Sequence, residues 1–412
     1  MKKETVSERF LRYVSVDTQS DENSNTFPST EKQKNLGRML YEELKAMGAS
    51  DAVFDENYGY VYAKIPGRAG EKTLGFIAHM DTSPDASGTD IKARVVENYD
   101  GGDILLNPER NIVMSPKTYP EMLAYKGQSL IVTDGTTLLG ADDKAGVAEI
   151  MAMAAWLLSH PEEEHAPIAI AFTPDEEVGG GVDHFDLKQF GADFAYTVDG
   201  GGIGELEYEN FNAASAKAVI HGINVHPGDA KDKMKNASLI AMEFNAMLPA
   251  DQRPDCTEGY EGFFHLTEMK GEVEHAELSY IIRDHDALKF AEKKKTIQDA
   301  ADAINAKYGE NTIELAVADS YYNMKSQIAP DYLFLIDEAC EAMKELGVEP
   351  KVQPIRGGTD GARLSYMGLP CPNLGTGGYA AHGPCEHITV EGMDLVVEIL
   401  KGIVKRYAEP VK

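Results

Sequence analysis

Histidine and carboxylate side chains concentrate in five short segments of this sequence, most of them directly after an apolar run. The segments are LGFIAHMD (74–81), LLGADDKAG (138–146), FTPDEEVGGG (172–181), YTVDGGG (196–202) and GGYAAHGPCEHIT (377–389). Binding sites in α/β sheets form at the carboxyl ends of strands. Mixed nitrogen and oxygen ligands, without clustered cysteines, suit zinc or a similar transition ion in a catalytic role. Two such ions near each other form a known hydrolytic arrangement.

Two of these segments have spacings with a direct chemical meaning. Residues i and i+2 of a strand share a face, so Asp81 can hold one ring nitrogen of His79 while the other nitrogen binds a metal. Three adjacent acids at 175–177 are costly to pack unless a cation or a proton compensates their charge. Each segment alone also has a plainer interpretation, such as a helix cap at Asp142 and Asp143, a turn or a solvated loop. The whole set, rather than any one member, predicts a metal centre.

The elements that must position these residues alternate between helix and strand over the first 210 residues. Helices are predicted at 29–48 and 144–160, and buried strands at 74–79, 167–173 and 194–199. The alternation predicts an α/β sheet covered by helices on both faces. After the middle of the chain the pattern resumes, with helices at 330–347 and 391–408 and a strand at 351–355.

The pattern between these two parts is different. Strands are predicted at 212–223 and 312–323, two more within 263–284 joined at Lys270-Gly271, and helices at 236–248 and 286–309. The order β-α-β-β-α-β is the ferredoxin-like arrangement. We therefore expect a discontinuous domain, 1–210 and 325–412, that carries the metal centre, and an inserted domain at 211–324.

Composition limits the partners. The 412 residues carry a net charge of −29, which repels nucleic acid and anionic membrane surfaces. No apolar stretch approaches the length of a membrane span, and no apolar signal region follows the first lysines. The four cysteines lie far apart, as expected of reduced thiols. We expect a cytoplasmic protein that binds neither nucleic acid nor membrane.

Six motifs together resemble the co-catalytic zinc peptidases that include glutamate carboxypeptidase-like enzymes, and within them the tripeptide aminopeptidases. They are HMD (79–81), GADDKAG (140–146), PDEEVG (174–179), TVDGG (197–201), RGGTDG (356–361) and HGPCE (382–386). The resemblance covers essentially the whole chain, including the insert. It implies a catalytic domain with helices on both faces of a mixed sheet, and a ferredoxin-like α+β lid or dimerisation domain.

The resemblance also implies two zinc ions per chain, with cobalt or manganese as substitutes. His79 and Asp199 would bind one ion, Glu177 and His382 the other, and Asp142 would bridge both. The three carboxylates and one hydroxide would neutralise two divalent cations, so the cluster could sit in a partly buried site. His387 stays an alternative ligand on spacing alone, and Cys385 beside it could compete for soft metals.

Two acids would act behind or beside the metals. Asp81 would orient His79, and Glu176 would be the general base. The resemblance further implies a cis peptide bond between Asp142 and Asp143. The expected reaction is release of the N-terminal residue of a tripeptide by attack of a zinc-bridging hydroxide, with Glu176 taking the proton.

Substrate contacts are expected from three further residues. His226 in the insert could stabilise the oxyanion, and Arg283 and Arg356 resemble positions suited to a peptide carboxylate, which an arginine fork can hold. Arg283 could instead be a surface charge. The open edge of the inserted sheet allows a homodimer.

Two alternatives differ from this reaction. A dipeptidase, a carboxypeptidase or an N-acyl amino acid deacylase could use the same scaffold. A non-catalytic metal- or peptide-binding module is a more distant alternative, and it would not need the intact acidic run at 175–177.

Overall fold

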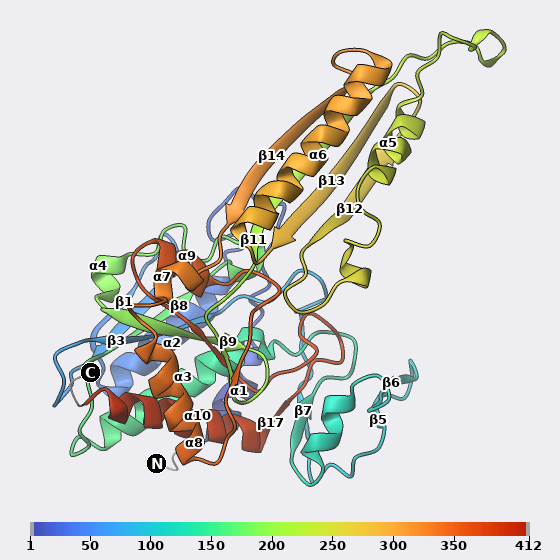
Figure 1. The fold of residues 1–412 in the computed structure, drawn as a ribbon. Helices are drawn as coiled ribbons and strands as arrows, with labels where there is room; N and C mark the ends of the chain where they lie inside the picture. The colour runs from blue at the N-terminus through green and yellow to red at the C-terminus, as the bar shows by residue number, and fades with distance from the viewer. Residues whose placement is uncertain (1–3, 409–412) are drawn as a thin grey trace. The chain divides into compact units, whose positions relative to one another are not determined.

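The computed structural model describes residues 4–408 (Figure 1). The chain divides into two compact units. The larger unit comprises Met1–Tyr208, Ser326–Gln353 and Thr359–Lys412, and the smaller unit comprises Glu209–Lys325 and Pro354–Gly358. The outermost ends of the predicted catalytic domain, 1–3 and 409–412, lie outside the described residues. The segment Pro354–Gly358 groups with the insert, although it follows a strand of the larger unit.

An eight-stranded mixed sheet forms the centre of the larger unit, with the order β1-β2-β8-β3-β9-β16-β10-β15. The strands are β1 (Ser50–Phe54), β2 (Val61–Ile65), β8 (Ile168–Thr173), β3 (Leu74–His79), β9 (Phe194–Gly200), β16 (Asn373–Gly375), β10 (Glu205–Glu207) and β15 (Lys351–Val352). The four central strands, β8, β3, β9 and β16, run parallel. The nearly continuous apolar sequences of β8 and β3 are typical of strands buried on both faces.

Helices cover both faces of this sheet, as predicted. One face packs on α1 (Val6–Val14), α2 (Gln33–Met47), α3 (Ala141–Ser159), α8 (Phe334–Glu345) and α10 (Val390–Arg406), and the other on α4 (Leu187–Phe190) and α9 (Asp360–Tyr366). Side chains alternate between the two faces along each strand. In β3, for example, Phe76 joins the core beneath α3, whereas Ile77 joins the core on the α4 and α9 side.

Some predicted elements differ in extent. The helix predicted at 330–347 is shorter, because only α8 lies within this range; the separate one-turn helix α7 (Lys325–Ile328) precedes it. The strand predicted at 351–355 is only β15. The region 82–140, for which nothing was predicted, forms η1 (Pro120–Tyr125) and the short strands β4 (Arg94–Val96), β5 (Ile104–Asn107), β6 (Ile112–Met114) and β7 (Leu130–Val132). Strand β7 also pairs with β17 (Ile388–Thr389).

The smaller unit has one antiparallel sheet in the order β12-β13-β11-β14. The elements are β11 (Asn212–His221), η3 (Pro227–Asp229), α5 (Ala237–Ala246), η4 (Pro254–Cys256), β12 (Phe263–Gly271), β13 (His275–Asp284), α6 (Ala287–Tyr308) and β14 (Ile313–Tyr321). Both long helices lie on the same face of the sheet (Figure 1). The ferredoxin-like prediction is confirmed, with the hairpin turn at 272–274 rather than at Lys270-Gly271.

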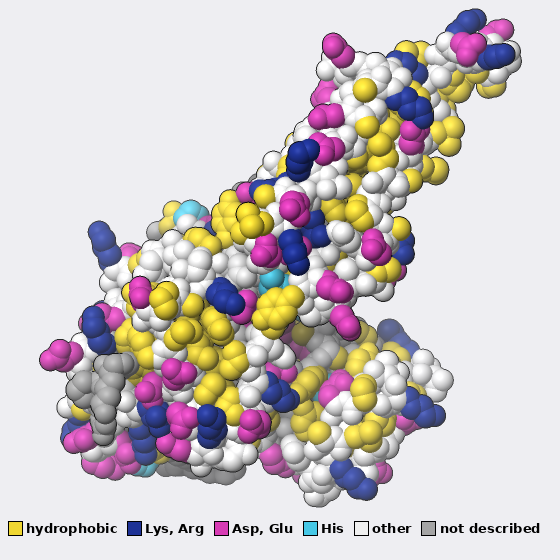
Figure 2. Space-filling view, viewed as in Figure 1, with side chains coloured by type: hydrophobic (Ala, Val, Ile, Leu, Met, Phe, Trp, Pro, Cys, Tyr) yellow, Lys and Arg dark blue, Asp and Glu magenta, His cyan; other side chains and the backbone are white. Residues whose placement is uncertain are grey.

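On the face drawn in Figure 2, Lys and Arg side chains are scattered among Asp and Glu side chains and do not gather into one patch. Within residues 4–408, no helix combines the length and the apolar content needed to cross a membrane. The cytoplasmic location stays a prediction.

Candidate active site

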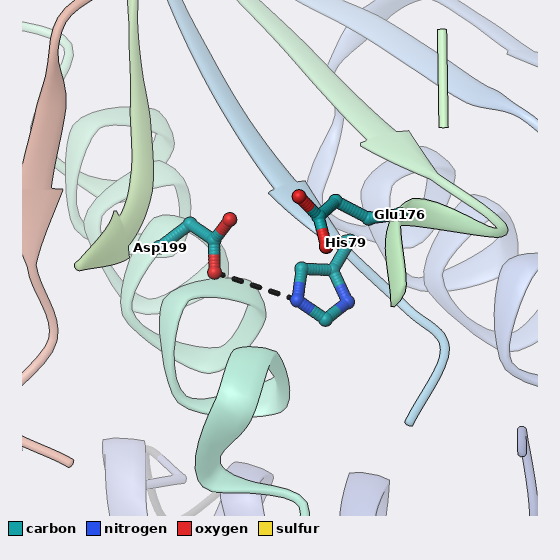
Figure 3. A group of neighbouring side chains, drawn as sticks. All are labelled: His79, Glu176 and Asp199. Carbon is teal, nitrogen blue, oxygen red and sulfur yellow. Dashed lines mark ion pairs between the residues drawn. The ribbon is translucent and has the colours of Figure 1, made fainter. Parts of the chain in front are cut away.

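The predicted site residues of the larger unit meet at the carboxyl edge of its parallel strands. His79 is the last residue of β3 and lies opposite Thr173, the last residue of β8. Asp199 lies near the end of β9, and Figure 3 shows it pointing toward His79 together with Glu176 from the turn after β8. Parallel strands end at one edge, so acids that are far apart in the sequence become neighbours.

Asp142 lies between two histidines, with one carboxylate oxygen toward each. His79 Nε2 is 2.9 Å from Asp142 Oδ1 and 3.4 Å from Asp199 Oδ1. His382 Nε2 is 3.4 Å from Asp142 Oδ2 and 2.9 Å from Glu177 Oε2. These contacts form two sets of nitrogen and oxygen atoms that share one carboxylate. Such a donor set suits a pair of transition-metal ions.

Two groups of side chains offer ligand atoms that all lie within 4.8 Å of one another. One is His79, Glu176 and Asp199, and the other is His79, Asp142 and Glu177. Within the described chain, Glu177 Oε1 is a buried oxygen without a hydrogen-bond partner. A buried oxygen of this kind needs a proton or a cation, so the residues present fit a metal centre.

Asp81 fixes two parts of the site at once. Its Oδ1 lies 3.3 Å from His79 Nδ1, and it also accepts a hydrogen bond from Glu176 N–H at 3.1 Å, while Oδ2 accepts from Glu177 N–H at 3.2 Å. Its side chain is fully buried. Asp81 therefore sets both the histidine ring and the turn η2 (Glu176–Val178) that carries two predicted site acids.

Glu386 is a site residue whose role the sequence analysis missed. Its Oε2 accepts from Leu139 N–H at 2.6 Å and Gly140 N–H at 2.7 Å, and its Oε1 accepts from Asp142 N–H at 2.9 Å. It thereby holds the loop that presents Asp142. The only signal in the sequence was its place in the motif HGPCE.

The backbone at the start of α3 is not helical at Asp142, a predicted metal ligand. The backbone of Asp142 (φ −82°, ψ 104°) and of Asp143 (φ −119°, ψ 28°) is not helical, and the bond between them is cis, as the resemblance implied. The alternative that these acids cap a helix is wrong, because their carboxylates bond elsewhere. Asp143 Oδ2 accepts from His79 N–H at 3.0 Å.

Comparison with known proteins finds relatives over the full length of the chain. Peptidase T of Clostridium acetobutylicum is 58% identical over 408 residues, which cover 98% of this chain and 100% of that protein. Peptidase T of Alkaliphilus oremlandii is 56% identical over 406 residues, which cover 98% of this chain and 99% of that protein.

The chain belongs to the peptidase T family.

Further comparisons agree with this assignment, and the resemblance seen in the motifs is confirmed. A family model described as a peptidase dimerisation domain matches residues 208–311. Aminopeptidase PepT from Bacillus cereus superposes with a TM-score of 0.77 at 22% identity, covering 98% of this chain and 99% of that one. A tripeptidase from Staphylococcus aureus gives 0.79 at 21% identity, with 98% of both chains covered. These solved structures share the fold.

A more distant structure carries a description of its metals. A Bacillus subtilis protein described as a dinuclear metal-binding peptidase of the M20 family superposes with a TM-score of 0.66 at 14% identity. The match covers 98% of this chain and 99% of that one. The peptidase T family member described here has the same fold, a mixed sheet with helices and an inserted domain.

Without bound metal, several site carboxyls of this peptidase T family member have pKa values shifted from their usual range. Burial, with Asp199 nearby, raises the pKa of Glu176 well above its usual range. Burial raises the pKa of Glu177 to about 7 and the pKa of Asp199 to about 6. For Asp142, burial is outweighed by hydrogen bonds to His382 and His79, which lower its pKa. A cluster that otherwise takes up protons is suited to hold cations instead.

His387 and Cys385 lie beside the site but join no ligand group among the described residues. His387 Nδ1 pairs with the carbonyl oxygen of Cys385 at 2.9 Å, and burial lowers the pKa of the ring. Cys385 is buried in the apolar cluster around η1. His382 is also outside these groups, but its Nε2 lies 2.9 Å from Glu177 Oε2 and 3.4 Å from Asp142 Oδ2, and these contacts favour His382 over His387 as the proposed ligand.

The three predicted substrate-binding residues belong to the smaller unit. His226 is exposed, and its Nδ1 accepts a hydrogen bond from Gly228 N–H at the start of η3. Arg283 Nη1 donates to the carbonyl oxygen of Arg356 at 3.0 Å, and its buried Nε has no hydrogen-bond partner within the described chain. These roles stay predictions.

Arg356 uses its guanidinium within the smaller unit. Nη1 donates to the carbonyl oxygen of Gly259 at 2.6 Å, and Nη2 donates to Thr257 Oγ1 at 3.0 Å. The guanidinium also lies over the rings of Phe211 and Phe263, 5.2 and 5.7 Å from their centroids. In this arrangement the Arg356 guanidinium holds the loop 257–261. Fewer of the guanidinium N–H groups of Arg283 are used in hydrogen bonds, so Arg283 is better able than Arg356 to bind a further acceptor.

Proposed function

We propose that this chain is a metal-dependent aminopeptidase that releases the N-terminal residue of tripeptides. The observation that carries the proposal is the placement of Asp142 between His79 and His382, with one carboxylate oxygen toward each. Full-length relatives named peptidase T, and structural neighbours named aminopeptidase and tripeptidase, support the substrate class.

The proposed metal set follows from these contacts. His79 and Asp199 would hold one ion, Glu177 and His382 would hold the second, and Asp142 would bind both. We propose zinc, with cobalt or manganese as substitutes, because the donors are imidazole nitrogens and carboxylate oxygens. When bound, such ions polarise a carbonyl oxygen and lower the pKa of coordinated water toward about 7.

The chain's own residues supply the proton transfer. We propose that Glu176 accepts a proton from water at its carboxylate and returns it to the departing amine. Its position is fixed through its backbone N–H by Asp81, while its side chain lies beside His79 and Asp199 (Figure 3). Asp81 keeps His79 oriented so that Nε2 faces the carboxylates.

Hydrolysis of a small peptide panel tests the proposal. The enzyme is assayed on Met-Gly-Gly, Gly-Gly and acetyl-Met-Gly-Gly, before and after chelation and after zinc is restored. Zinc-dependent release of free methionine from the tripeptide alone supports the tripeptide aminopeptidase. Cleavage of the dipeptide or of the acetylated peptide points to the dipeptidase, carboxypeptidase or deacylase alternatives. Zinc binding without any cleavage supports the non-catalytic module.

We also propose that the smaller unit mediates a homodimer. The family model matched at 208–311 is described as a dimerisation domain, and β12 and β14 are the two edges of the sheet. An open edge can pair with a second copy. Light scattering after size-exclusion chromatography measures the mass, and a mass of one chain at all concentrations contradicts the dimer.

A further inference from the structure

A small cavity lies against Asp142 and Asp199 in the larger unit. Its volume is about 140 Å³, and its other walls come from residues within 199–201 and 376–381, with Asp143 and Glu386. An apolar cavity of about 150 Å³ admits a molecule the size of benzene. The space therefore fits one side chain of moderate size.

The wall formed by Tyr379 is held in place by its neighbours. The backbone N–H and carbonyl oxygen of Tyr379 pair with those of His387, at 3.0 Å in both directions. The Tyr379 ring stacks on the His387 ring, with centroids 6.0 Å apart, and lies 5.8 Å from the Tyr125 ring. These contacts fix the Tyr379 wall, so the cavity is present in the folded chain before any substrate binds.

Gly378 lines the same cavity without being required by the backbone. A methyl group added there would meet only Ala141 Cβ and Thr376 Oγ1, both at 3.5 Å, which is ordinary contact. Gly200, another lining residue, differs, because a methyl group there would come within 2.9 Å of the backbone of 374–375. The backbone at position 378 does not require glycine. Its lack of a side chain therefore leaves space in the cavity.

The charged residues around the cavity are all acidic, namely Asp142, Asp143, Asp199 and Glu386. Two of them belong to the proposed metal set, and the other two are buried behind it. No basic side chain lines the cavity. The carboxylate of an acidic side chain would therefore enter the cavity without a basic partner, which disfavours acidic side chains there.

We propose that this cavity receives the side chain of the substrate's N-terminal residue, with Gly378 and Tyr379 setting the largest side chain accepted. This inference rests on the proposed aminopeptidase function. The residue before the cleaved bond must lie next to the metal ligands. In an aminopeptidase this is the N-terminal residue, and a cavity that holds a single side chain suits it. Tripeptides beginning with Ala, Met, Leu or Phe fit, and those beginning with Asp, Glu or Trp do not.

Steady-state kinetics with matched tripeptides tests the assignment. The zinc-loaded enzyme is assayed on Ala-Gly-Gly, Met-Gly-Gly, Phe-Gly-Gly and Asp-Gly-Gly, and on Ala-Phe-Gly, which moves the large side chain beyond the cleaved bond. The variants are Gly378→Ala, which narrows the cavity, Tyr379→Ala, which widens it, and Tyr379→Phe, which keeps the ring. Gly383→Ala is the control, because it lies in the same loop outside the cavity and an added methyl group meets nothing closer than 3.6 Å.

The expected readout is the ratio of kcat/KM for Phe-Gly-Gly to that for Ala-Gly-Gly. It should fall about tenfold or more in Gly378→Ala, since one methylene in a pocket changes discrimination by about 10- to 200-fold. It should rise in Tyr379→Ala and stay near the parent value in Tyr379→Phe and Gly383→Ala. Asp-Gly-Gly should be the poorest substrate of the parent enzyme.

Two results overturn the inference while leaving the aminopeptidase intact. One is a ratio that stays constant in both Gly378→Ala and Tyr379→Ala although Ala-Gly-Gly is cleaved. The other is a change in selectivity confined to Ala-Phe-Gly, which assigns the cavity to the residue after the cleaved bond. If the parent enzyme cleaves none of the peptides, the proposed function itself fails.

Discussion

Replacing Glu386 by glutamine should weaken metal binding although Glu386 is not a proposed ligand. The carboxylate accepts three backbone N–H groups, from Leu139, Gly140 and Asp142, at 2.6 to 2.9 Å. An amide has only one oxygen. In Glu386→Gln that oxygen can keep the two bonds made by Oε2, and the new NH2 group then faces the Asp142 N–H, donor against donor.

The expected size of the effect follows from the single bond that is lost. A hydrogen bond to a charged group contributes about 1.5 to 3 kcal/mol, and this one fixes the backbone of Asp142, the proposed bridging residue. Substitutions behind metal ligands typically lower metal affinity about 10- to 100-fold, which is about 1.4 to 2.8 kcal/mol. The two figures agree, so we expect a loss within this range.

Competition between the enzyme and a chromogenic zinc chelator measures the affinity. Glu391→Gln is the matched control, because Glu391 Oε2 also accepts a backbone N–H, from Ser129 at 2.9 Å, but contacts no proposed ligand segment. Glu391→Gln should bind zinc like the parent enzyme. Parental zinc affinity in Glu386→Gln would refute the idea that Glu386 positions Asp142.

Three further substitutions have distinct expected outcomes. Glu176→Ala should lower kcat by about 100-fold or more while zinc stays bound, since general acid–base catalysis contributes about 10²- to 10⁴-fold; turnover near the parental rate would exclude Glu176 as the base. Asp81→Asn should lower zinc affinity about 10- to 100-fold, because one of the two backbone N–H groups of η2 then faces an amide NH2; unchanged affinity in chelator competition contradicts this. Glu149 is buried in α3 with both carboxyl oxygens unpartnered in the described chain, and burial raises its pKa well above the usual value. The folded chain then keeps a proton that the unfolded chain releases above pH about 4.5, so stability falls as pH rises through this window. Glu149→Gln removes this loss. The variant should match the parent below that pH and gain up to about 1.4 kcal/mol per pH unit above it, as judged by denaturant midpoints, and a pH-independent difference would argue against a protonated Glu149.

The central strands and the ligand segments could be predicted because each combines two local signals. A short apolar run indicates a buried strand, and polar residues at its end indicate a site. His79 after β3 and Asp199 at the end of β9 are examples. Region 82–140 lacked such signals, because its strands have only three or four residues and expose side chains such as Leu105 and Val113.

The residues that hold the ligands could not be predicted, because their partners are remote in the sequence. Glu386 bonds to amides more than 240 positions earlier. The grouping of Arg356 with the smaller unit likewise depends on Phe211, Phe263 and the loop 257–261, which only the fold brings together. Spacing within one segment carries no information about such contacts.

The site contains more acids than the two proposed metal ions need, and the hydrogen bonds explain the excess. Four buried carboxylates accept backbone N–H groups from a different segment of the site or its surroundings: Asp81 from 176–177, Asp143 from 79, Asp175 from 29 and Glu386 from 139–142. An amide side chain in their place brings donors against donors. These acids accept backbone hydrogen bonds, and the remaining acids are free for the proposed roles of metal ligand (Asp142, Glu177 and Asp199) and general base (Glu176). An acidic run after a strand can therefore mark two layers of a site, and only contacts across segments separate them.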